Sequence, residues 1–585
     1  MNNLNPVYTE RTECQDCYKC VRECPVKAIK IQNGAAAVIP ELCILCGHCV
    51  DVCPAGAKRV RDDLEKVKQL IKDRKKVYVS LAPSFTSEFS GVKPGQLISA
   101  LKRLGFHGVS ETALGAQQVS AHVAHQLGLK TGKIVISSAC PAVSHYITRY
   151  LPDFTQSMTQ LLSPMLTHSK MLRKRYGNDI GIVFVGPCIA KKREADSHPQ
   201  LIDCALTYDG LRRWFELENI DPAQITPGET DVFVPHSAEE GALYPIDGGM
   251  SATLKANCTV HDACFMSFSG IKNIRKALEG LDKVDIKGNI FIEALSCEGG
   301  CINGPGSTGN SATAAKRYSV VNYASYPRKK IPRSPTIPIN EFATDTPVEN
   351  RNYDEESICA ALRQVGKIKK DDELNCGGCG YDSCRDFAAA LLTGKAERTM
   401  CVTYMRILAQ NKASGLLRTM PSGVVIVNEK LEIIESNRNF ARLFGPEMEK
   451  IFETNPGLEG ASLKKILSFH ELFRHVLDTG EDLINRDIRV NERILHGSIF
   501  TIEPHSVVGG VIADITAPSI QKEQVIHRAQ DIIKKNLTMV QKIAYLLGEN
   551  ASESEAVLNS IIESFSLKPL EKLTDSPETQ SSQPE

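Results

Sequence analysis

Sixteen of the twenty cysteines in this 585-residue chain stand in tight, regular spacings, which is how thiolate ligands of metal clusters are arranged. Disulfides are the alternative, but disulfide frameworks belong mostly to small secreted domains. This chain is long, and residues 1–13 are polar, without the charged and then apolar segments of a secretory signal. We therefore expect metal clusters in a cytoplasmic protein.

The first eight cysteines form two copies of C-x2-C-x2-C-x3-C-P, beginning at Cys14 and Cys43. This pattern resembles that of two-cluster bacterial ferredoxins, in which the fourth cysteine of each run binds the cluster of the other run. The resemblance assigns one [4Fe-4S] cluster to Cys14, Cys17, Cys20 and Cys53, and a second to Cys43, Cys46, Cys49 and Cys24. A pair of zinc sites is the alternative, although zinc does not need a doubled run ending in proline. Two clusters in a domain at 1–60 imply an electron relay and a redox partner such as ferredoxin.

Four further cysteines are far apart in the sequence, yet each follows a short apolar run. The three segments that contain them are S-S-A-C-P at 137–141, G-P-C-I-A-K-K-R-E at 186–194 and S-C-E-G-G-C at 296–301. The apolar runs are rich in β-formers and alternate with helical patterns, which predicts an α/β fold. Loops at strand ends build the sites of such folds, so four thiolates there suit one [4Fe-4S] cluster.

Together these segments resemble the three cluster-binding signatures of the [FeFe]-hydrogenases, over residues 77–326. The resemblance implies an H-cluster, in which a [4Fe-4S] cubane is joined to a diiron unit that carries CO, CN and a dithiolate. By motif its ligands are Cys140, Cys188, Cys297 and Cys301, with Cys301 bridging to the diiron unit. Lys191 matches the lysine that donates to one cyanide, and Pro83 and Ser84 match the residues beside the other. A solvated surface lysine is the alternative for Lys191.

The departures from the family concern proton transfer. Ala139 stands where catalytic members have a cysteine that passes a proton to the dithiolate, and a methyl group cannot do so. Glu194 matches the outer member of the proton relay, but no glutamate occurs between Glu111 and Glu194. Losing a positioned acid or base costs about 10²- to 10⁴-fold in rate, so we expect slow turnover with catalytic roles for Cys301, Lys191 and Glu194.

Three more departures surround the same site. Gly186 and Leu295 stand where the family usually has methionines, and Met165 replaces a glutamine. We expect the shape of the pocket near the diiron unit to differ from that of the fast enzymes.

A proline-rich stretch at 327–349 predicts a semi-rigid linker between domains. After a short amphipathic helix at 355–365, four cysteines follow with the spacing C-x2-C-x4-C-x16-C, namely Cys376, Cys379, Cys384 and Cys401. The spacing resembles a small [4Fe-4S] domain shared by corrinoid iron-sulfur proteins and some membrane redox subunits, here at 350–404. Zinc is again the alternative.

The segment 410–516 has no cysteine and resembles a PAS domain. A strand-turn-strand pattern leads to a helix that opens at Asn437, and further strands are expected at 487–490, 494–503 and 507–515. An unrelated small α/β domain is the alternative. We expect no cofactor in it.

Helices are predicted at 517–567 and a disordered tail at 568–585. Apolar residues from Ile526 to Leu547 follow a 3-4 seam with one polar position, Asn536. This spacing favours a parallel coiled-coil homodimer, with a helix packed on the PAS-like domain as the alternative. His527 lacks the acidic neighbour of a phospho-acceptor, so we do not expect a histidine kinase.

Overall composition excludes little. The 69 basic residues balance 69 acidic ones, so nothing points to nucleic acid, and no apolar run approaches the ~20 residues of a membrane helix. The four remaining cysteines, Cys204, Cys258, Cys264 and Cys359, are expected to be buried thiols.

The sequence thus predicts a multidomain α/β and α+β protein. Our main hypothesis is a sensor of H2 or redox state, with low hydrogenase activity, that signals through the PAS-like domain to a partner protein. The alternatives are a catalytic, ferredoxin-linked [FeFe]-hydrogenase and an electron-transfer protein that lacks the diiron unit.

Overall fold

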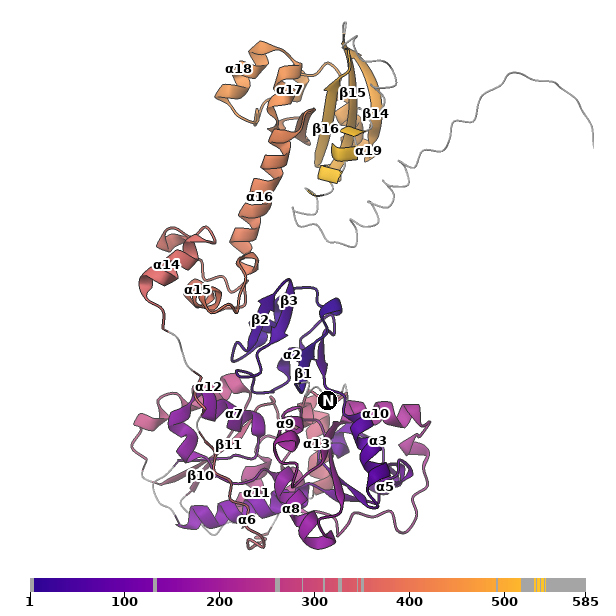
Figure 1. Ribbon diagram of the computed structural model, residues 1–585, viewed down its shortest axis with the longest axis vertical. Helices are drawn as coiled ribbons and strands as arrows, with labels where there is room; N and C mark the ends of the chain where they lie inside the picture. Colours follow the sequence, from indigo (N-terminus) through magenta and orange to yellow (C-terminus); the bar gives the residue numbers. More distant parts are fainter. Residues whose placement is uncertain are drawn as a thin grey trace, which may run out of the picture. The chain divides into compact units, whose positions relative to one another are not determined.

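The computed structural model describes residues 5–129, 134–257, 263–286, 288–308, 311–324, 329–344, 346–348, 352–490 and 493–516, with a few more between 531 and 542. The chain divides into two compact units, Met1–Met400 and Cys401–Glu585, each of which is described by itself (Figure 1). No helix of the described residues is long and apolar enough to cross a membrane.

The cysteine-rich N-terminal segment folds into two small antiparallel strand pairs with two short helices. Strands β1 (Val7–Thr9) and β4 (Lys58–Val60) form one pair, and β2 (Ile29–Gln32) and β3 (Ala35–Val38) form the other. Each cysteine run leads into one of the helices α1 (Lys19–Glu23) and α2 (His48–Asp51). The doubled sequence pattern therefore gives a doubled structure.

Two parallel sheets form the core of the first unit, in the orders β6-β5-β8-β9 and β10-β11-β7. The strands are β5 (Val77–Leu81), β6 (Gly108–Glu111), β7 (Ile134–Ile136), β8 (Gly181–Gly186), β9 (Cys204–Thr207), β10 (Ala263–Ser269) and β11 (Asn289–Leu295). The intervening helices are α3 (Leu64–Asp73), α4 (Phe85–Glu88), α5 (Pro94–Arg103), α6 (Ala113–Leu129), α7 (Pro141–Tyr150), α8 (Pro164–Tyr176), α9 (Ala190–Ser197), α10 (Tyr208–Leu217), α11 (Gly249–Asn257), α12 (Ile271–Leu278) and α13 (Thr313–Ala324). This architecture confirms the predicted α/β fold.

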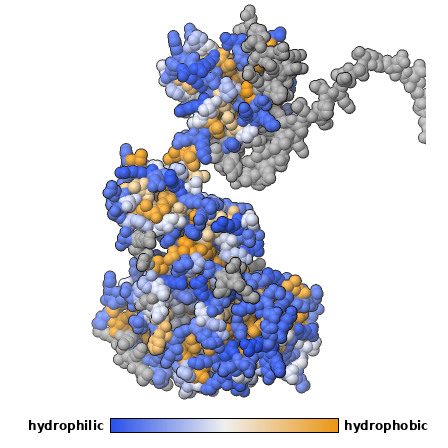
Figure 2. Space-filling view, viewed as in Figure 1, coloured by the Kyte–Doolittle hydropathy of each residue, from blue (hydrophilic) through white to orange (hydrophobic). Residues whose placement is uncertain are grey.

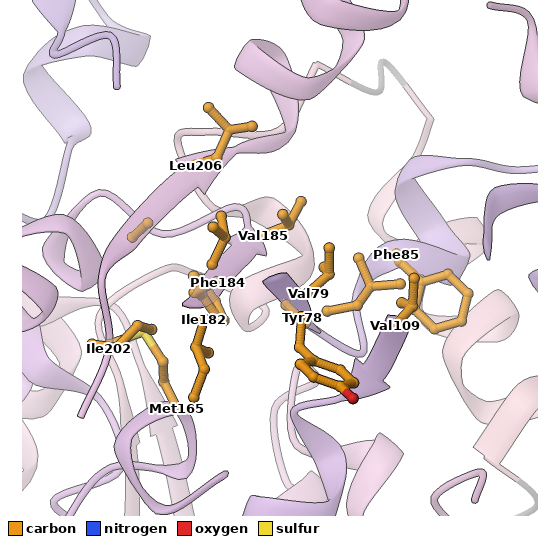
Figure 3. Packing of buried hydrophobic residues seen from close by; sticks show 14 of the residues in the cluster. Tyr78, Val79, Phe85, Val109, Met165, Ile182, Phe184, Val185, Ile202 and Leu206 are labelled. Carbon is orange, nitrogen blue, oxygen red and sulfur yellow. The ribbon is translucent and has the colours of Figure 1, made fainter. Parts of the chain in front are cut away.

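The four-stranded sheet is buried on both faces, which explains why its strands read as continuous apolar runs. All residues of β5 and β8 are buried. Figure 3 shows the side chains of Val79 from β5 and of Ile182 and Val185 from β8 in this core, together with Met165 from α8. The packing fixes the carboxyl ends of the strands, where the sequence motifs begin.

The proline-rich stretch was predicted to be a semi-rigid linker between domains, but much of it packs on the core. Residues 329–343, here called the strap, run along the core: Ile337 and Ile339 are buried in its main apolar cluster. Leu162 N donates to Ile339 O at 2.8 Å, and Glu341 N donates to Gln160 O at 2.9 Å. The strap is fixed because its alternate apolar side chains and its backbone both find partners on the core.

The rest of the first unit is a small helical domain. It contains α14 (Glu355–Arg363) and α15 (Cys384–Leu392), which pack together through Ile358, Leu362 and Ala388. Asp354 and Ser383 cap the two helices by accepting backbone N–H groups. Both helices lie close to their predicted positions.

The second unit begins with α16 (Val402–Thr419), which leads into a five-stranded antiparallel sheet of order β13-β12-β16-β15-β14. Its strands are β12 (Gly423–Asn428), β13 (Ile433–Ser436), β14 (Leu483–Val490), β15 (Arg493–Glu503) and β16 (Val507–Asp514). The helices α17 (Arg438–Leu443), α18 (Pro446–Thr454) and α19 (His470–Thr479) lie between β13 and β14 in the chain. Asn437 caps α17, at the position predicted for the helix start.

Most of the predicted coiled-coil seam, together with His527 and the tail at 568–585, lies outside the described residues. Asn536 is described and is 4% exposed, with its Nδ2 at 3.5 Å from Ser422 Oγ. Met539 packs against Leu417, Met420 and Val424 of the same unit. These contacts favour the packed helix over the dimer seam for this part of the segment.

The prediction of buried thiols holds for Cys204 but is wrong for Cys264, which is exposed because it lies on β10 at the edge of its sheet. Cys359 is half-buried, and Cys258 lies outside the described residues.

The visible face of the first unit is largely hydrophilic, with smaller hydrophobic patches between the polar areas (Figure 2).

Candidate metal-cluster site

Four cysteines, three of which follow strand ends, line one cavity in the first unit. Cys140 follows β7, Cys188 follows β8 and Cys297 follows β11, while Cys301 opens a short 3-10 turn. The two sheets bring these ends together although the residues are up to 161 positions apart (301 minus 140). The structure therefore assembles the ligand set that the family resemblance implies.

The cavity suits a cluster that carries thiolates. Burial raises the pKa of Cys188 to about 11, and burial and the neighbouring cysteines raise the pKa values of Cys297 and Cys301. Thiolates that share one cavity need cations to neutralise their charge, and metal binding supplies them. None of the described cavity-lining residues is a carboxylate or a histidine, so the donor set is purely sulfur, which favours iron-sulfur or zinc chemistry.

Two helices that begin beside these cysteines also favour negative charge on the sulfurs. Helix α7 begins at Pro141, directly after Cys140, and α9 begins two residues after Cys188. The positive ends of both helix dipoles therefore face the thiolates, which stabilises negative charge there. Across the described ranges, no three His, Cys, Asp or Glu side chains meet closely enough to hold a single metal ion; these cysteines instead line a common cavity.

The N-terminal ferredoxin-like segment completes the wall of this cavity with Leu45 and Cys46. The segment packs tightly against the core: a Cβ on Gly47 would lie 2.3 Å from Pro305 Cγ, so only glycine fits. Arg149 donates to Cys43 O at 3.0 Å. The cysteine run from Cys43 is thus the one that faces the core.

The eight N-terminal cysteines gather in two groups. Burial raises the pKa of Cys20 to about 11, with further contributions from Cys14, Cys17 and Cys53. Burial likewise raises the pKa of Cys49, with contributions from Cys46, Cys43 and Cys24. The cysteines whose charges act on Cys20 and on Cys49 are the same ones that the ferredoxin pattern groups with each of them.

The cysteines of the third motif are placed around α15 and before α16. Cys376 is exposed, Cys379 is half-buried and Cys384 is buried at the start of α15. Cys401 is buried and directly precedes α16 in the second unit.

Lys191 is not a solvated surface lysine. It is 8% exposed, and its Nζ donates to Ser163 Oγ at 2.8 Å and to Glu194 Oε2 at 2.7 Å. Its charge acts on Cys188 and Cys301. The ammonium is oriented by Ser163, a partner that sequence reasoning did not find, and its charge is felt by two of the cysteines that line the cavity.

Pro83 and Ser84, which the family resemblance places at the diiron unit, are both buried between β5 and α4. Ser84 Oγ lies 3.0 Å from the hydroxyl of Tyr208, which donates to Ala82 O at 2.9 Å. Burial strongly raises the pKa of Tyr208, to which the Cys301 charge also contributes. This network holds the turn after β5 in place.

The positions that depart from the family pattern are packed by other groups. A Cβ on Gly186 would lie 2.7 Å from Ala82 Cβ and 2.6 Å from Phe184 Cζ, so a methionine side chain has no room there. Met165 is fully buried. Ala139 N donates to Ser137 Oγ at 3.2 Å, and that hydroxyl lies 3.1 Å from Met250 Sδ.

A buried carboxyl group near Cys301 was missed by the sequence reasoning. Glu293 is 1% exposed on β11 and accepts the backbone N–H groups of Met250 and Ser251 at 3.2 and 2.9 Å. Burial raises its pKa to about 7, and its charge acts on Cys301. The available signal was a glutamate inside an otherwise apolar strand four residues before Cys297.

Comparisons with known families agree with this arrangement. Residues 75–305 match the iron only hydrogenase large subunit, C-terminal domain. Residues 6–63 match a 4Fe-4S dicluster domain, and residues 372–403 match a putative Fe-S cluster domain.

Two curated relatives are hydrogenases. The NADP-reducing hydrogenase subunit HndD of Solidesulfovibrio fructosivorans is 24% identical over 59% of this chain and 73% of its own length. Iron hydrogenase 1 of Clostridium pasteurianum is 26% identical over 51% of this chain and 64% of its own, so the chain spans just under two thirds of that enzyme. A solved variant of the [FeFe]-hydrogenase HydA1 from Chlamydomonas reinhardtii shares 18% identity, covers 47% of this chain and 91% of that one, and has a TM-score of 0.36.

The fold and the cysteine sites define an iron-sulfur protein with a ferredoxin module ahead of an α/β core. Its core is similar to the iron only hydrogenase large subunit, and the segments before and after the core are similar to a 4Fe-4S dicluster domain and to a small Fe-S domain.

Proposed function

We propose that this chain is an [FeFe]-hydrogenase of low turnover, which oxidises H2 or reduces protons at the core and exchanges electrons through the ferredoxin module. The observation that carries the proposal is the common cavity of Cys140, Cys188, Cys297 and Cys301, whose wall includes Cys46 of the module. The names of the two curated relatives favour catalysis over a purely sensory role.

The site residues are assigned by position and chemistry. The four core cysteines would hold the cubane of an H-cluster, with Cys301 as the bridge to the diiron unit. When bound, that cluster supplies the metal centre at which H2 is split or formed. Lys191 brings a buried ammonium to the cavity, a strong donor for an anionic ligand in a dry site. Pro83 and Ser84 lie in the turn after β5, which the Tyr208 network holds in place.

Proton transfer has to differ from that of the fast enzymes, because Ala139 carries no acidic proton. Glu293 is the buried carboxyl group whose charge acts on Cys301, and a pKa of about 7 suits a group that gains and loses protons near neutral pH. Asp247, which is only half-buried, acts on Glu293 and accepts the hydroxyls of Ser267 and Ser269. These residues support a route for protons from the cavity side to the surface.

The decisive measurement is the infrared spectrum of the matured full-length protein. Bands from CO and CN are expected, and H2 evolution should be measurable but far below that of fast enzymes. The absence of those bands from a fully matured sample would leave an electron-transfer protein as the function.

The proton route is tested by Glu293→Gln. We expect H2 evolution to fall by at least about tenfold, within the range that a positioned acid or base contributes, and the limb of the pH–rate profile near pH 7 to disappear. Glu298→Gln is the matched control, because Glu298 is exposed in the neighbouring loop. Equal rates in the two variants would exclude Glu293 from the route.

A sensory role is the second candidate, favoured by the C-terminal sheet. The sheet is antiparallel with the order β13-β12-β16-β15-β14, and three helices lie between β13 and β14. This arrangement supports a PAS-type domain. Such a domain would pass the redox state of the clusters to a partner protein. We expect hydrogen exchange in residues 423–514 of the full chain to change between H2 and argon; identical exchange would argue against signalling through this domain.

A further inference from the structure

The last residues of the ferredoxin module hold helix α9 through a buried ion pair. Lys192 Nζ on α9 donates to Asp63 Oδ2 at 2.7 Å and to Ala205 O at 3.0 Å. The side chains of Lys192 and Asp63 are only 1% and 7% exposed. Burying a charge costs free energy unless the charge is paired and hydrogen-bonded. The Lys192 ammonium is therefore stable in this place only while Asp63 faces it.

Arg61 extends this contact to a second point on the same helix. Its Nε donates to Asp63 Oδ1 at 2.9 Å, and its Nη1 and Nη2 donate to the two carboxylate oxygens of Asp196 at 2.8 and 3.1 Å. Asp196 follows Lys192 by four positions, so both lie on one face of α9. These four side chains, here called the α9 network, fix the rotation of the helix because they hold it at two points one turn apart.

The carboxylate of Asp63 points to α9 and not to its own helix. Asp63 directly precedes α3, a position from which an aspartate usually accepts a backbone N–H of the helix that follows. Among the described residues its side chain accepts no such bond, and the neighbouring Asp62 accepts Leu64 N at 3.0 Å instead. Asp63 is thus used for the contact with α9, whereas Asp62 has the local role.

The same helix carries Lys191. Helix α9 begins two residues after Cys188, which lines the cysteine cavity, and its eight residues are too few for a helix that is stable without tertiary contacts. Successive residues of a helix point about 100° apart, so Lys191 points in a different direction from Lys192. There Ser163 and Glu194 bind its ammonium. The direction of Lys191 therefore depends on how the opposite contacts of α9 are held.

We propose that Arg61 and Asp63 are positioning residues for Lys191: through the α9 network, the ferredoxin module holds the Lys191 ammonium in its place on the core. The module thus shapes the core site mechanically, in addition to the electron exchange proposed above. The positioning involves only side chains of this chain. The task of Lys191 as a donor to an anionic ligand rests on the proposed function.

The test measures how fast N-acetoxysuccinimide acetylates Lys191 in the full chain, reconstituted with iron and sulfide alone. Tandem mass spectrometry of the digested protein gives the rate for each lysine. Asp63→Asn keeps the size of the side chain and removes its charge. We expect Lys191 to react at least about tenfold faster in this variant, because loss of a buried ion-pair partner makes local opening easier. The exposed Lys174 should react at the same rate in both proteins.

Asp62→Asn is the matched control, because Asp62 is the preceding residue, is 49% exposed and makes no contact with α9 among the described residues. Its rate for Lys191 should equal that of the parent protein. Arg61→Gln is a milder second variant, which removes the contact with Asp196 and leaves the buried ion pair. It should also accelerate the labelling of Lys191, and it keeps the test decisive if the first variant does not fold.

The rates are compared in variants that keep the Trp214 fluorescence of the folded parent protein. Faster labelling of Lys192 with an unchanged rate for Lys191 would overturn the proposal, because the network would then hold only its own members. In the matured protein, the infrared CN bands should shift in Asp63→Asn and not in Asp62→Asn. Absence of CN bands from the matured parent protein would reject the proposed function, whereas the labelling rates would still decide the positioning of Lys191.

Discussion

Ala139 directly precedes Cys140, which lines the cysteine cavity, and its methyl group packs against the main apolar cluster of the core. The ligands around it are complete, and Lys191 is held in place by two partners. At this position, what differs from the family pattern is the expected proton donor, whereas the cysteine ligands are all present.

Replacing Ala139 by cysteine tests that distinction. We expect Ala139→Cys to raise the rate of H2 evolution by at least about tenfold, a part of the 10²–10⁴ that a positioned acid contributes. The gain should be incomplete, because no glutamate stands on α6. Turnover of the matured protein is the measurement, and Ala139→Ser is the control, since a hydroxyl is too weak an acid. Equal rates in the parent protein and in both variants would show that the missing thiol at position 139 does not limit turnover.

A second buried carboxyl group makes stability depend on pH. Glu111 is fully buried, accepts the Tyr323 hydroxyl at 3.0 Å and the Ala238 N–H at 2.9 Å, and burial raises its pKa to about 7. Its unfolded pKa is about 4.3, so between these values the folded state binds more protons. Glu111 therefore reduces stability as pH rises toward 7, with no further change above it.

Glu111→Gln should remove this dependence. We expect the melting temperature of the variant, relative to the parent protein, to increase from pH 5.5 to 7.5 and then level off. Differential scanning calorimetry measures it, with Glu229→Gln, an exposed carboxylate, as control. A difference that does not vary with pH would contradict the raised pKa.

At this scale the sequence was most informative about ligands, because cysteine spacing reflects direct bonds to a metal cluster. It was least informative about partners that meet only in the fold. Ser163 orients Lys191 although the two residues are 28 positions apart in the sequence. Glu293 lies on β11, and its charge acts on Cys301. Neither contact leaves a local pattern.

Among the elements, the strap shows how composition misleads. Prolines at 332, 335 and 338 predict a linker, but they do not prevent their neighbours from packing. Ile337 and Ile339, on either side of Pro338, are both buried in the core. The strand segments were easier to predict, since a parallel sheet that is covered on both faces requires continuous apolar runs.

Ile339→Ala tests whether the strap belongs to the core. Truncating a fully buried isoleucine costs about 2–5 kcal/mol, so the first unit should unfold at lower urea concentration. The single tryptophan, Trp214, is buried in the core and reports the transition by fluorescence. Phe342→Ala is the control on the same strap, because Phe342 is 81% exposed and should contribute little. Similar losses in both variants would argue against a packed strap.

For the whole molecule, we expect the two units to depend on metal to different extents. The ferredoxin module is small, and its buried Ile44 and Leu45 pack in clusters shared with the core, whereas the five-stranded sheet has an apolar core of its own, which includes Val425, Phe440 and Phe473. Small domains commonly need metal to fold.

Removal of iron should therefore unfold the module selectively. We expect anaerobic chelation to abolish hydrogen-exchange protection in residues 5–63 while residues 423–514 keep theirs. Mass spectrometry of the full chain resolves the two regions in one sample. Parallel loss of protection in both would show that the second unit also depends on the clusters.

The order of the three cysteine-bearing segments that family models match could be predicted from the sequence because each cysteine motif is local. The docking of the small Fe-S domain on the ferredoxin module could not, because it depends on contacts such as Ile31 N to Lys395 O and on Gly380, whose backbone approaches Val21 closely. Long-range contacts of this kind follow from shape and not from residue type.

The closure of the core cavity by Leu45 and Cys46 has a consequence for biosynthesis. With Gly47 pressed against Pro305, one wall of the cavity exists only after the ferredoxin module has docked. A cubane inserted into the core from that side has to arrive first. Loading of iron and sulfur would then follow a sequence, core before module, and a chain that folds its module too early would trap an empty core.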